Sequence, residues 1–248
     1  MPAPRPRHFD AHADVYDRGR PPYPDVVWAR LRELEVLVPG ARVLELGAGT
    51  GQATRSLTAA GTSVTAVEPG PHLARSLRRN LPDVEVRVGT AETAWFPTAS
   101  FDVAVAATSV HWFDLDVVLP ALHRWLVPNG SFVVVRNAFG DPTAALTPFR
   151  ARIAEVTSRR STPTPSGPGE LDTADWVTRL TSGGLFAPRH VEEFRWSIDL
   201  TTTQVHDLFS TFSNWNEAEV DEAAGAVEEL GGSVLEDYVT PLIVLRRR

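Results

Sequence analysis

A glycine-rich turn between a short apolar run and a helix is the feature that most limits how this chain can fold. Residues 43–46 are mostly apolar, and Gly47, Gly49 and Gly51 follow before a predicted helix that starts at Gln52. Glycine tolerates left-handed backbone and lets a ligand approach the main chain closely. The start of a helix adds unpaired N–H groups and a partial positive charge, which favour an anionic group. The sequence therefore predicts a strand–turn–helix unit with a ligand site at the turn.

The glycine spacing separates this turn from two other nucleotide-binding loops. It reads G-x-G-x-G, with Gln52 following, and so departs from the dinucleotide pattern G-x-G-x-x-G. No Gly-Lys-Ser/Thr follows, which excludes the phosphate-binding P-loop. Glu45, two residues before the first glycine, would repel a pyrophosphate but suits a ligand that carries an ammonium group. An NAD(P)-dependent oxidoreductase is therefore disfavoured, although it remains an alternative beside a non-catalytic binding protein and an ordinary glycine-rich turn.

The stretch resembles motif I of the class I S-adenosylmethionine (SAM)-dependent methyltransferases. In that family the acid and the glycine loop hold the methionine end of SAM, which has an amine and a carboxylate. The resemblance implies SAM as cofactor, S-adenosylhomocysteine as product, and a methionine-end site formed by Glu45, Gly47, Ala48, Gly49 and Gly51.

Two further strand ends supply cofactor candidates. A strand predicted over residues 62–67 ends at Glu68 and Pro69, about 20 residues after the loop, where an acid meets ribose hydroxyls in Rossmann-like sheets. A carboxylate accepts both hydroxyl protons, whereas the alternative is an exposed acid at a strand end. A third strand over residues 84–88 leads to a short acidic turn. In the family such a turn holds adenine, which implies roles for Thr90, Ala91 and Glu92; Glu92 equally suits a helix cap.

The fourth predicted strand, residues 101–107, is continuously apolar, as buried parallel strands are. Ligands of open α/β sheets bind beyond the carboxyl ends of strands, so Thr108, His111 and Trp112 are expected near the cofactor. Imidazole titrates near neutral pH, which makes His111 the candidate catalytic base; the alternative is that it only shapes the pocket. Trp112 is either an aromatic wall beside the adenosyl group or a core residue.

The N-terminal segment carries a second resemblance. Its Phe9…Tyr16…Arg20-Pro21…Tyr23-Pro24 run is similar to the start of the trans-aconitate methyltransferase-like subgroup, in which this segment lies over the cofactor as part of a lid. The resemblance implies a lid over residues 9–23, and a Pro, Ser, Thr and Gly-rich loop at residues 161–169 is expected to move with it. The candidate substrate-binding residues are Tyr16, Arg20, Tyr23 and Trp215, with Arg18 as an alternative donor and Phe139 and Phe212 as further aromatic walls.

The expected fold is an α/β Rossmann-like domain with helices on both faces and a small helical insertion. The resemblance implies a mostly parallel seven-stranded sheet of order 3-2-1-4-5-7-6 with the last strand antiparallel. Residues 1–248 are expected to form one domain: a lid segment over 1–37, a SAM-binding half over 38–136, a substrate side over 137–235, and a last strand and tail over 236–248. Within these parts, a helix is predicted from residue 24 to 37 and strands over 189–198 and 238–245. Asn129 is expected to replace the glycine of a family turn, because asparagine tolerates positive φ.

Composition limits the classes of partner that this chain is expected to bind. The net charge is −7 and there is no cysteine, so neither a basic nucleic-acid footprint nor a thiolate site is expected. The histidines and acids show no metal-ligand spacing, no apolar run is long enough for a membrane span, and a cytoplasmic protein is expected. We therefore predict methyl transfer to a small molecule, at a hydroxyl or carboxylate oxygen, and leave the oligomeric state open. Transfer is an in-line displacement, which needs a base only if the acceptor must lose a proton.

Overall fold

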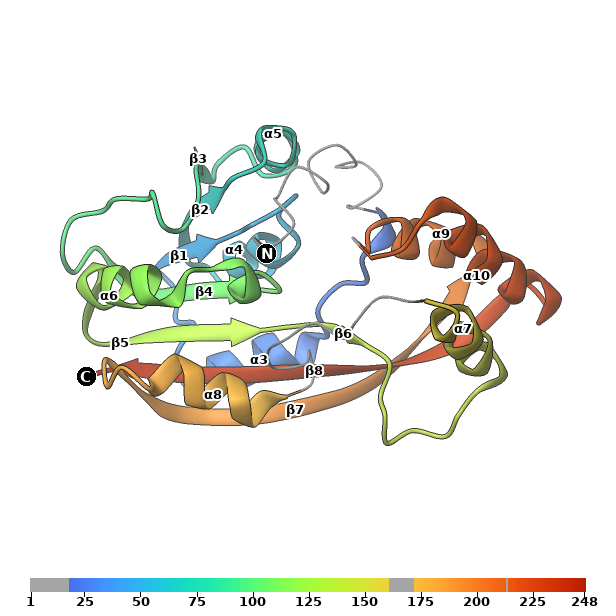
Figure 1. The fold of residues 1–248 in the computed structure, drawn as a ribbon. Coiled ribbons are helices and arrows are strands. Elements are labelled where there is room, and N and C mark those ends of the chain that lie inside the picture. The colour runs from blue at the N-terminus through green and yellow to red at the C-terminus, as the bar shows by residue number, and fades with distance from the viewer. Residues whose placement is uncertain (1–17, 161–171, 213) are drawn as a thin grey trace.

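One twisted sheet organises the protein, as a computed structural model that describes residues 18–160, 172–212 and 214–248 shows (Figure 1). Its strands run in the order β3-β2-β1-β4-β5-β8-β6, and β7 pairs with β8. Their bounds are β1 (Arg42–Leu46), β2 (Ser63–Glu68), β3 (Glu85–Val88), β4 (Phe101–Ala107), β5 (Leu126–Val135), β6 (Ala138–Phe139), β7 (Phe186–Thr201) and β8 (Ser233–Arg247).

The predicted topology is confirmed, with one addition. Strands β1 to β5 pair in parallel, and β8 is antiparallel to both β5 and β7. With β7 and β8 taken as the sixth and seventh strands, the order is the expected 3-2-1-4-5-7-6. The addition is β6, which is too short at two residues to produce an alternating sequence pattern. Both β7 and β8 also extend beyond their predicted bounds, because they continue to pair with each other past the edge of the parallel sheet.

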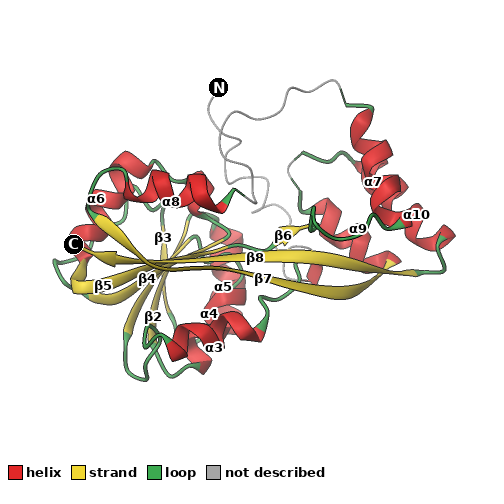
Figure 2. Ribbon diagram, turned by 90° about the horizontal axis from the view of Figure 1, so that it is seen from below, coloured by secondary structure: helices red, strands yellow, loops and turns green. Residues whose placement is uncertain are grey.

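Helices cover both faces of the sheet, as Figure 2 shows. Helices α6 (Leu115–Trp125) and α8 (Thr173–Thr181) lie on one face, where they bury a core that includes Leu122, Trp176 and Phe132. On the other face lie α3 (Asp25–Glu33) and α4 (Gln52–Ala59), over a core that includes Leu31 and Leu57. Helix α5 (Pro71–Asn80) packs beside β2 and β3. Burial on both faces explains why β4 is apolar from Val103 to Ala107.

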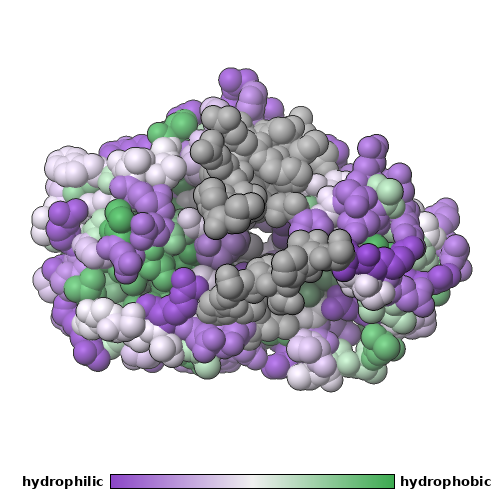
Figure 3. All heavy atoms as spheres, viewed as in Figure 1, coloured by the Kyte–Doolittle hydropathy of each residue, from purple (hydrophilic) through white to green (hydrophobic). Residues whose placement is uncertain are grey.

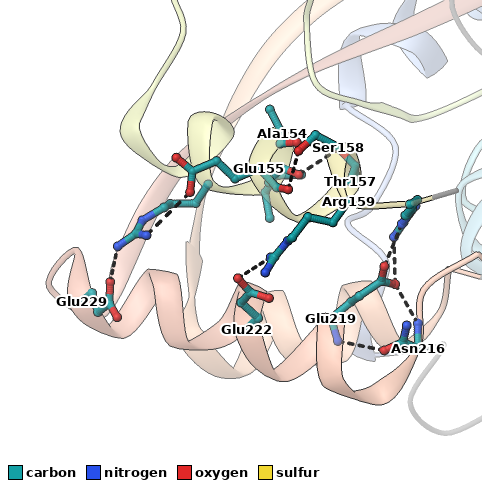
Figure 4. A network of polar contacts seen from close by, with 12 residues as sticks. Ala154, Glu155, Thr157, Ser158, Arg159, Asn216, Glu219, Glu222 and Glu229 are labelled. Carbon is teal, nitrogen blue, oxygen red and sulfur yellow. Dashed lines mark hydrogen bonds and ion pairs between the residues drawn. The ribbon is translucent and has the colours of Figure 1, made fainter.

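The expected helical insertion is a cluster at the far ends of β7 and β8 (Figure 1). It consists of α7 (Pro148–Ser158), α9 (Thr202–Ser210) and α10 (Glu217–Glu229), with a core that includes Phe149 and Phe209. Three ion pairs join α7 and the residues after it to α10 (Figure 4): Arg152–Glu229 at 2.6 Å, Arg159–Glu222 at 2.5 Å and Arg160–Glu219 at 2.8 Å. The first two pairs are exposed, so they align the helices more than they stabilise them.

The first helix ends earlier than the sequence predicts. Helix α3 ends at Glu33 rather than at residue 37, because the chain turns at Glu35, whose φ is +53°. The N–H of Val36 donates to the carbonyl of Leu31 and that of Glu35 to Arg32, both at 2.9 Å, which is the Schellman pattern of helix ends. This motif usually has glycine where Glu35 lies, so the sequence gives no breaker signal. The apolar residues that follow, Val36 and Leu37, are buried in the core beneath α3.

The other expected turn is confirmed at Asn129, which has a φ of +63° at an irregularity in β5.

Hydrophilic residues predominate on the face in Figure 3, with apolar residues scattered between them. Within the described part of the chain, no helix is long and apolar enough to cross a membrane. The same residues contain no group of three or more His, Cys, Asp or Glu side chains arranged to hold a metal ion.

Candidate active site

The carboxyl ends of three neighbouring strands bring the predicted residues to one edge of the sheet. Because β1 pairs in parallel with β2 and β4, Leu46 lies opposite Val67, and Glu45 lies opposite Val105. The glycine turn after β1, Glu68 at the end of β2 and Thr108 after β4 therefore share this edge. This is where an open α/β sheet binds its ligand.

The turn after β1 requires glycine. Gly47, Gly49 and Gly51 have φ values of +74°, +59° and +98°. A Cβ on Gly47 would lie 2.6 Å from the Cβ of Ser109, and one on Gly51 would lie 2.4 Å from Cδ1 of Leu77. Both the backbone conformation and the close packing therefore exclude side chains at these two positions.

Glu68 joins the glycine turn to the start of α5. One carboxylate oxygen accepts the N–H of Gly49 at 2.7 Å, and the other accepts the N–H of Gly70, also at 2.7 Å. The side chain is buried at the end of β2. A carboxylate oxygen can accept more than one hydrogen bond, which is the property that recognition of two neighbouring hydroxyl groups requires.

Glu45 is a carboxyl group enclosed within the sheet edge. It is 1% exposed, and its Oε2 accepts the hydroxyl of Thr54, on α4, at 2.6 Å. Burial raises the pKa of Glu45 to about 8; the Thr54 hydrogen bond opposes the shift and the charge of Glu68 adds to it. A nearby ammonium group would offset this burial cost, because an opposite charge favours the ionised carboxylate.

The turn after β3 is tied to the segment that follows β4. Oε1 of Glu92 accepts the backbone N–H of Asp114 at 3.0 Å, and Asp114 caps α6. Thr90 begins a tight turn in which its carbonyl accepts the N–H of Thr93 at 3.2 Å, and Ala91 is buried. The three residues predicted to contact adenine thus form a fixed turn beside the loop that carries His111 and Trp112. Pro69, the other predicted cofactor contact in this region, is partly buried after β2.

A cavity of about 230 Å³ lies between the parallel sheet and the helical cluster. Its walls come from the N-terminal segment, the start of α4, the ends of β4 and β5, β6, the region of α9, and β8. The lining residues are Arg20, Pro21, Tyr23, Gln52, Thr108, Asn137, Phe139, Leu208, Phe212, Asn214, Trp215 and Tyr238.

Hydrogen bonds fix the N-terminal segment to the cavity wall. The hydroxyl of Tyr23 lies 2.7 Å from Oγ1 of Thr108, and the amide of Gln52 donates to the carbonyl of Arg20 at 2.9 Å. Asn137 donates to the carbonyls of Pro21 and Pro22, both at 3.2 Å, and accepts from Thr240 at 2.8 Å. The described part of the predicted lid is therefore held against the sheet edge.

Arg20 and Arg18 lie in different surroundings. The Arg20 guanidinium donates to the carbonyl of Thr211 at 3.3 Å and lies 4.7 Å from the ring centre of Phe212, at the cavity wall. Arg18 is exposed, and its Nε lies 3.5 Å from the carboxylate of Asp207. Only Arg20 of these two candidates lines the cavity.

His111 lies on the 3-10 turn η1 (Val110–Trp112) and is partly buried. Burial is the main cause that lowers the pKa of His111 to about 3, and the charges of Arg136 and Arg20 contribute to the same shift. Its Nδ1 is enclosed without a hydrogen-bond partner among the residues described. The imidazole is therefore neutral near pH 7, and it has too little proton affinity to act as an effective base in this arrangement. Trp112 lies beside it, with ring centres 4.7 Å apart.

The structure brings some of the predicted residues together and separates others. Arg20, Tyr23, Thr108 and Trp215 share the cavity with Phe139 and Phe212, whereas His111 and Trp112 are not part of its lining. Tyr16, the rest of the lid up to residue 17 and the loop at 161–169 lie outside the described residues. Asn137 and Tyr238, which also line the cavity, were not identified from the sequence. Asn137 could have been identified, because it follows β5 and ligands of open α/β sheets bind beyond the carboxyl ends of the strands.

The fold and these strand-end residues define the class I SAM-dependent methyltransferase architecture. Residues 44–134 match a family model described as a methyltransferase domain, and SAM is the cofactor that the strand-end residues suit.

Known relatives agree with this assignment. An uncharacterized methyltransferase of Mycobacterium tuberculosis is 37% identical over 131 residues, which are 52% of this chain and 51% of that protein. A malonyl-[acyl-carrier protein] O-methyltransferase of Halorhodospira halophila is 35% identical over 157 residues, 60% of this chain and 52% of that protein. The matched part spans about half the length of each of these curated relatives. The structure of a putative type II methyltransferase from Anaeromyxobacter dehalogenans has the same fold, with a TM-score of 0.57 at 23% identity, over 92% of this chain and 97% of that one.

Proposed function

We propose that the protein transfers the methyl group of SAM to a carboxylate oxygen of a small molecule bound in the cavity. The observation that carries this proposal is the guanidinium of Arg20 at the cavity wall. A guanidinium binds carboxylates through charge-assisted hydrogen bonds and so orients their oxygens. The H. halophila relative is named as an O-methyltransferase, which is consistent with an oxygen acceptor.

The electrostatics of His111 favour a carboxylate over a hydroxyl acceptor. A hydroxyl must lose a proton, and the lowered pKa of His111, about 3, makes its imidazole a poor proton acceptor. A carboxylate is already ionised near neutral pH and needs no base. Among the described residues that line the cavity there is no histidine, aspartate or glutamate.

The residues after β1 and β2 suit the two polar ends of SAM. We assign its methionine end to Glu45, Gly47, Ala48, Gly49 and Gly51, its ribose to Glu68 and Pro69, and its adenine to Thr90, Ala91 and Glu92. Two observations support this: Glu45 is a buried carboxyl with one hydrogen bond and no ion pair among the described residues, and the glycine turn has no room for a Cβ at Gly47. Thr108 and Trp112 follow β4 at the same edge and are assigned to the adenosyl side.

The protein's part in the reaction is to position and enclose the reactants. SAM supplies a methyl group that its sulfonium already activates. Arg20 orients the acceptor, while the aromatic residues Tyr23, Phe212 and Trp215 exclude water from the cavity. The hydrogen bonds of Asn137 and Gln52 hold the N-terminal segment over this edge, and we propose that residues 1–37 act as the lid, as the trans-aconitate methyltransferase-like resemblance implies.

A metabolite panel tests the proposal. The purified protein is incubated with SAM and with carboxylic acids, their matched primary amides and alcohols, trans-aconitate among the acids. The expected result is release of S-adenosylhomocysteine with the acids and a methyl ester product identified by mass spectrometry. Release with the alcohols but not with the acids would reject the carboxylate acceptor and return His111 to consideration as a base.

A further inference from the structure

Tyr238 contributes to the cavity lining and has a buried hydroxyl group that the rest of the described structure leaves unsatisfied. The side chain is 2% exposed, and its hydroxyl has no hydrogen-bond partner among the described residues. Leaving a buried hydroxyl unpaired is unfavourable, because the group has lost its hydrogen bonds to water. A polar group left unpaired at the wall of a cavity is one that a ligand can satisfy.

The ring of Tyr238 is held firmly in place. It stacks on Trp196 at 4.9 Å between ring centres, and the edge-to-face contact with Phe139 is at 5.7 Å. Trp196 is itself fixed, because its indole N–H donates to Thr240 at 2.8 Å. A ligand that reaches the hydroxyl therefore meets a group whose position is already set, which lowers the entropic cost of binding.

The charges around Tyr238 favour an anion. Alternate residues of β8 face the helical cluster, so Glu236 lies on the same side of the strand as Tyr238. Glu236 is buried, and its carboxyl lies 3.5 Å from the guanidinium of Arg150. Arg20 lines the same cavity as Tyr238. Two guanidiniums and one carboxyl thus give the surroundings a net positive balance.

The hydroxyl keeps its proton at working pH. Burial raises the pKa of Tyr238 above its ordinary value and Glu236 raises it further, while the charges of Arg20 and Arg150 act in the opposite direction. A protonated phenol offers one hydrogen-bond donor to an acceptor oxygen.

We propose that Tyr238 is a specificity-determining residue whose hydroxyl donates a hydrogen bond to a carboxylate of the bound acceptor, beside the guanidinium of Arg20. This inference rests on the carboxylate acceptor proposed above and names a second donor for it. It also gives the helical cluster a role in choosing the acceptor, because the Tyr238 ring on β8 packs in the core of that cluster.

The test uses binding rather than turnover. The chain has three tyrosines, so protein labelled with ¹³C at tyrosine Cζ gives few signals, and Tyr238→Phe assigns one of them. With S-adenosylhomocysteine present, benzoate is titrated as the probe, and benzylamine, which has the same ring but no acceptor oxygen, as the control. Benzoate should shift the Tyr238 signal, and its Kd should rise roughly tenfold or more in Tyr238→Phe. Benzylamine should not shift the Tyr238 signal, and Tyr238→Phe should not weaken its binding.

A matched variant separates this effect from a general change in the strand pair. Ser197→Ala also removes one hydroxyl, which hydrogen-bonds to Asp237 at 2.5 Å outside the cavity lining, and it should bind benzoate as the wild type does. Equal benzoate affinity in the wild type and Tyr238→Phe, or no benzoate binding to the wild type, would overturn the proposal. If Tyr238→Phe does not fold, Tyr16→Phe and Tyr23→Phe identify the Tyr238 signal by exclusion. A shift of that signal with benzoate then supports the proposal, and no shift overturns it. A shifted Tyr238 signal without any methyl ester in the metabolite panel would reject the proposed reaction and would support only a carboxylate-binding role for the Tyr238 hydroxyl.

Discussion

The carboxylate of Glu68 accepts the backbone N–H of Gly49 at 2.7 Å, which connects the ends of β2 and β1 across the candidate cofactor site. Its other oxygen accepts the N–H of Gly70, so one side chain fixes two turns. The residue predicted to bind the ribose therefore also shapes the glycine loop. Binding and local stability are coupled at this position.

Glu68→Ala should weaken SAM binding by about 1.5–3 kcal/mol, because two hydroxyl groups lose a charged acceptor. It should also lower the free energy of unfolding by about 1–3 kcal/mol, since the N–H groups of Gly49 and Gly70 lose their partner. Calorimetric titration and urea unfolding measure the two effects. The control is Glu85→Ala, an exposed acid at the start of β3, which should change SAM affinity little. Unchanged SAM affinity in Glu68→Ala would reject the ribose assignment.

Gly47→Ala should destabilise the protein by about 1–3 kcal/mol, because the new Cβ would lie 2.6 Å from the Cβ of Ser109 at a φ of +74°. SAM binding should weaken as well, since the loop must move to make room. Gly183→Ala is the matched control: a Cβ there meets nothing within 4 Å, and its φ is not among the positive ones. Thermal unfolding and SAM titration of both variants check this. Equal stability of the two would show that the loop relaxes freely.

The sequence predicted the parts of this site that depend on local pattern and strand position. The glycines, Glu45 and Glu68 were identified from their order along the chain, because a parallel sheet brings strand ends to one edge. Tyr238 was not, because the cavity it lines depends on how far β7 and β8 extend past the sheet to the helical cluster. The end of α3 was also missed, since Glu35 adopts the conformation that usually marks a glycine.

The unliganded protein should lose stability as pH rises from about 4.5, the ordinary pKa of a glutamate, to about 8. Burial raises the pKa of Glu45 to about 8, above its value in the unfolded chain, so the folded state binds this proton more tightly. The stability that follows from this is present at low pH and is lost as pH rises through about 8. Glu236, with a pKa raised to about 7 mainly by burial, contributes in the same direction.

Urea unfolding across this range measures the slope for the wild type, Glu45→Gln and Glu236→Gln. Each variant should flatten the pH dependence, because glutamine has no proton to lose. In the wild type, SAM binding near pH 7 should release protons if its ammonium group lies near Glu45, which calorimetry in buffers of different ionisation enthalpy detects. An unchanged slope in Glu45→Gln would mean that this carboxyl is ionised in the folded state.

The last prediction separates the two acceptor classes through Arg20 and His111. If the acceptor is a carboxylate, Arg20→Ala should raise its KM roughly tenfold or more, because a charge-assisted hydrogen bond contributes about 1.5–3 kcal/mol. His111→Ala should then change kcat little, and the wild-type rate should show no imidazole titration between pH 5 and 8, since the pKa of His111 is lowered to about 3. The measurement is steady-state kinetics at saturating SAM with the best acid of the panel.

Arg18→Ala is the matched control, since Arg18 is an exposed arginine two residues from Arg20 that pairs with Asp207. It should leave both KM and kcat near the wild-type values.

A hydroxyl acceptor makes the opposite prediction: His111→Ala would lower kcat by roughly 100-fold or more with SAM affinity intact, and the wild-type rate would fall as pH drops through the imidazole pKa. For that outcome, acceptor binding would have to raise the pKa of His111 well above 3, against its burial and the charges of Arg136 and Arg20. If neither Arg20→Ala nor His111→Ala alters turnover, the acceptor lies elsewhere than at the edge between the N-terminal segment and β4.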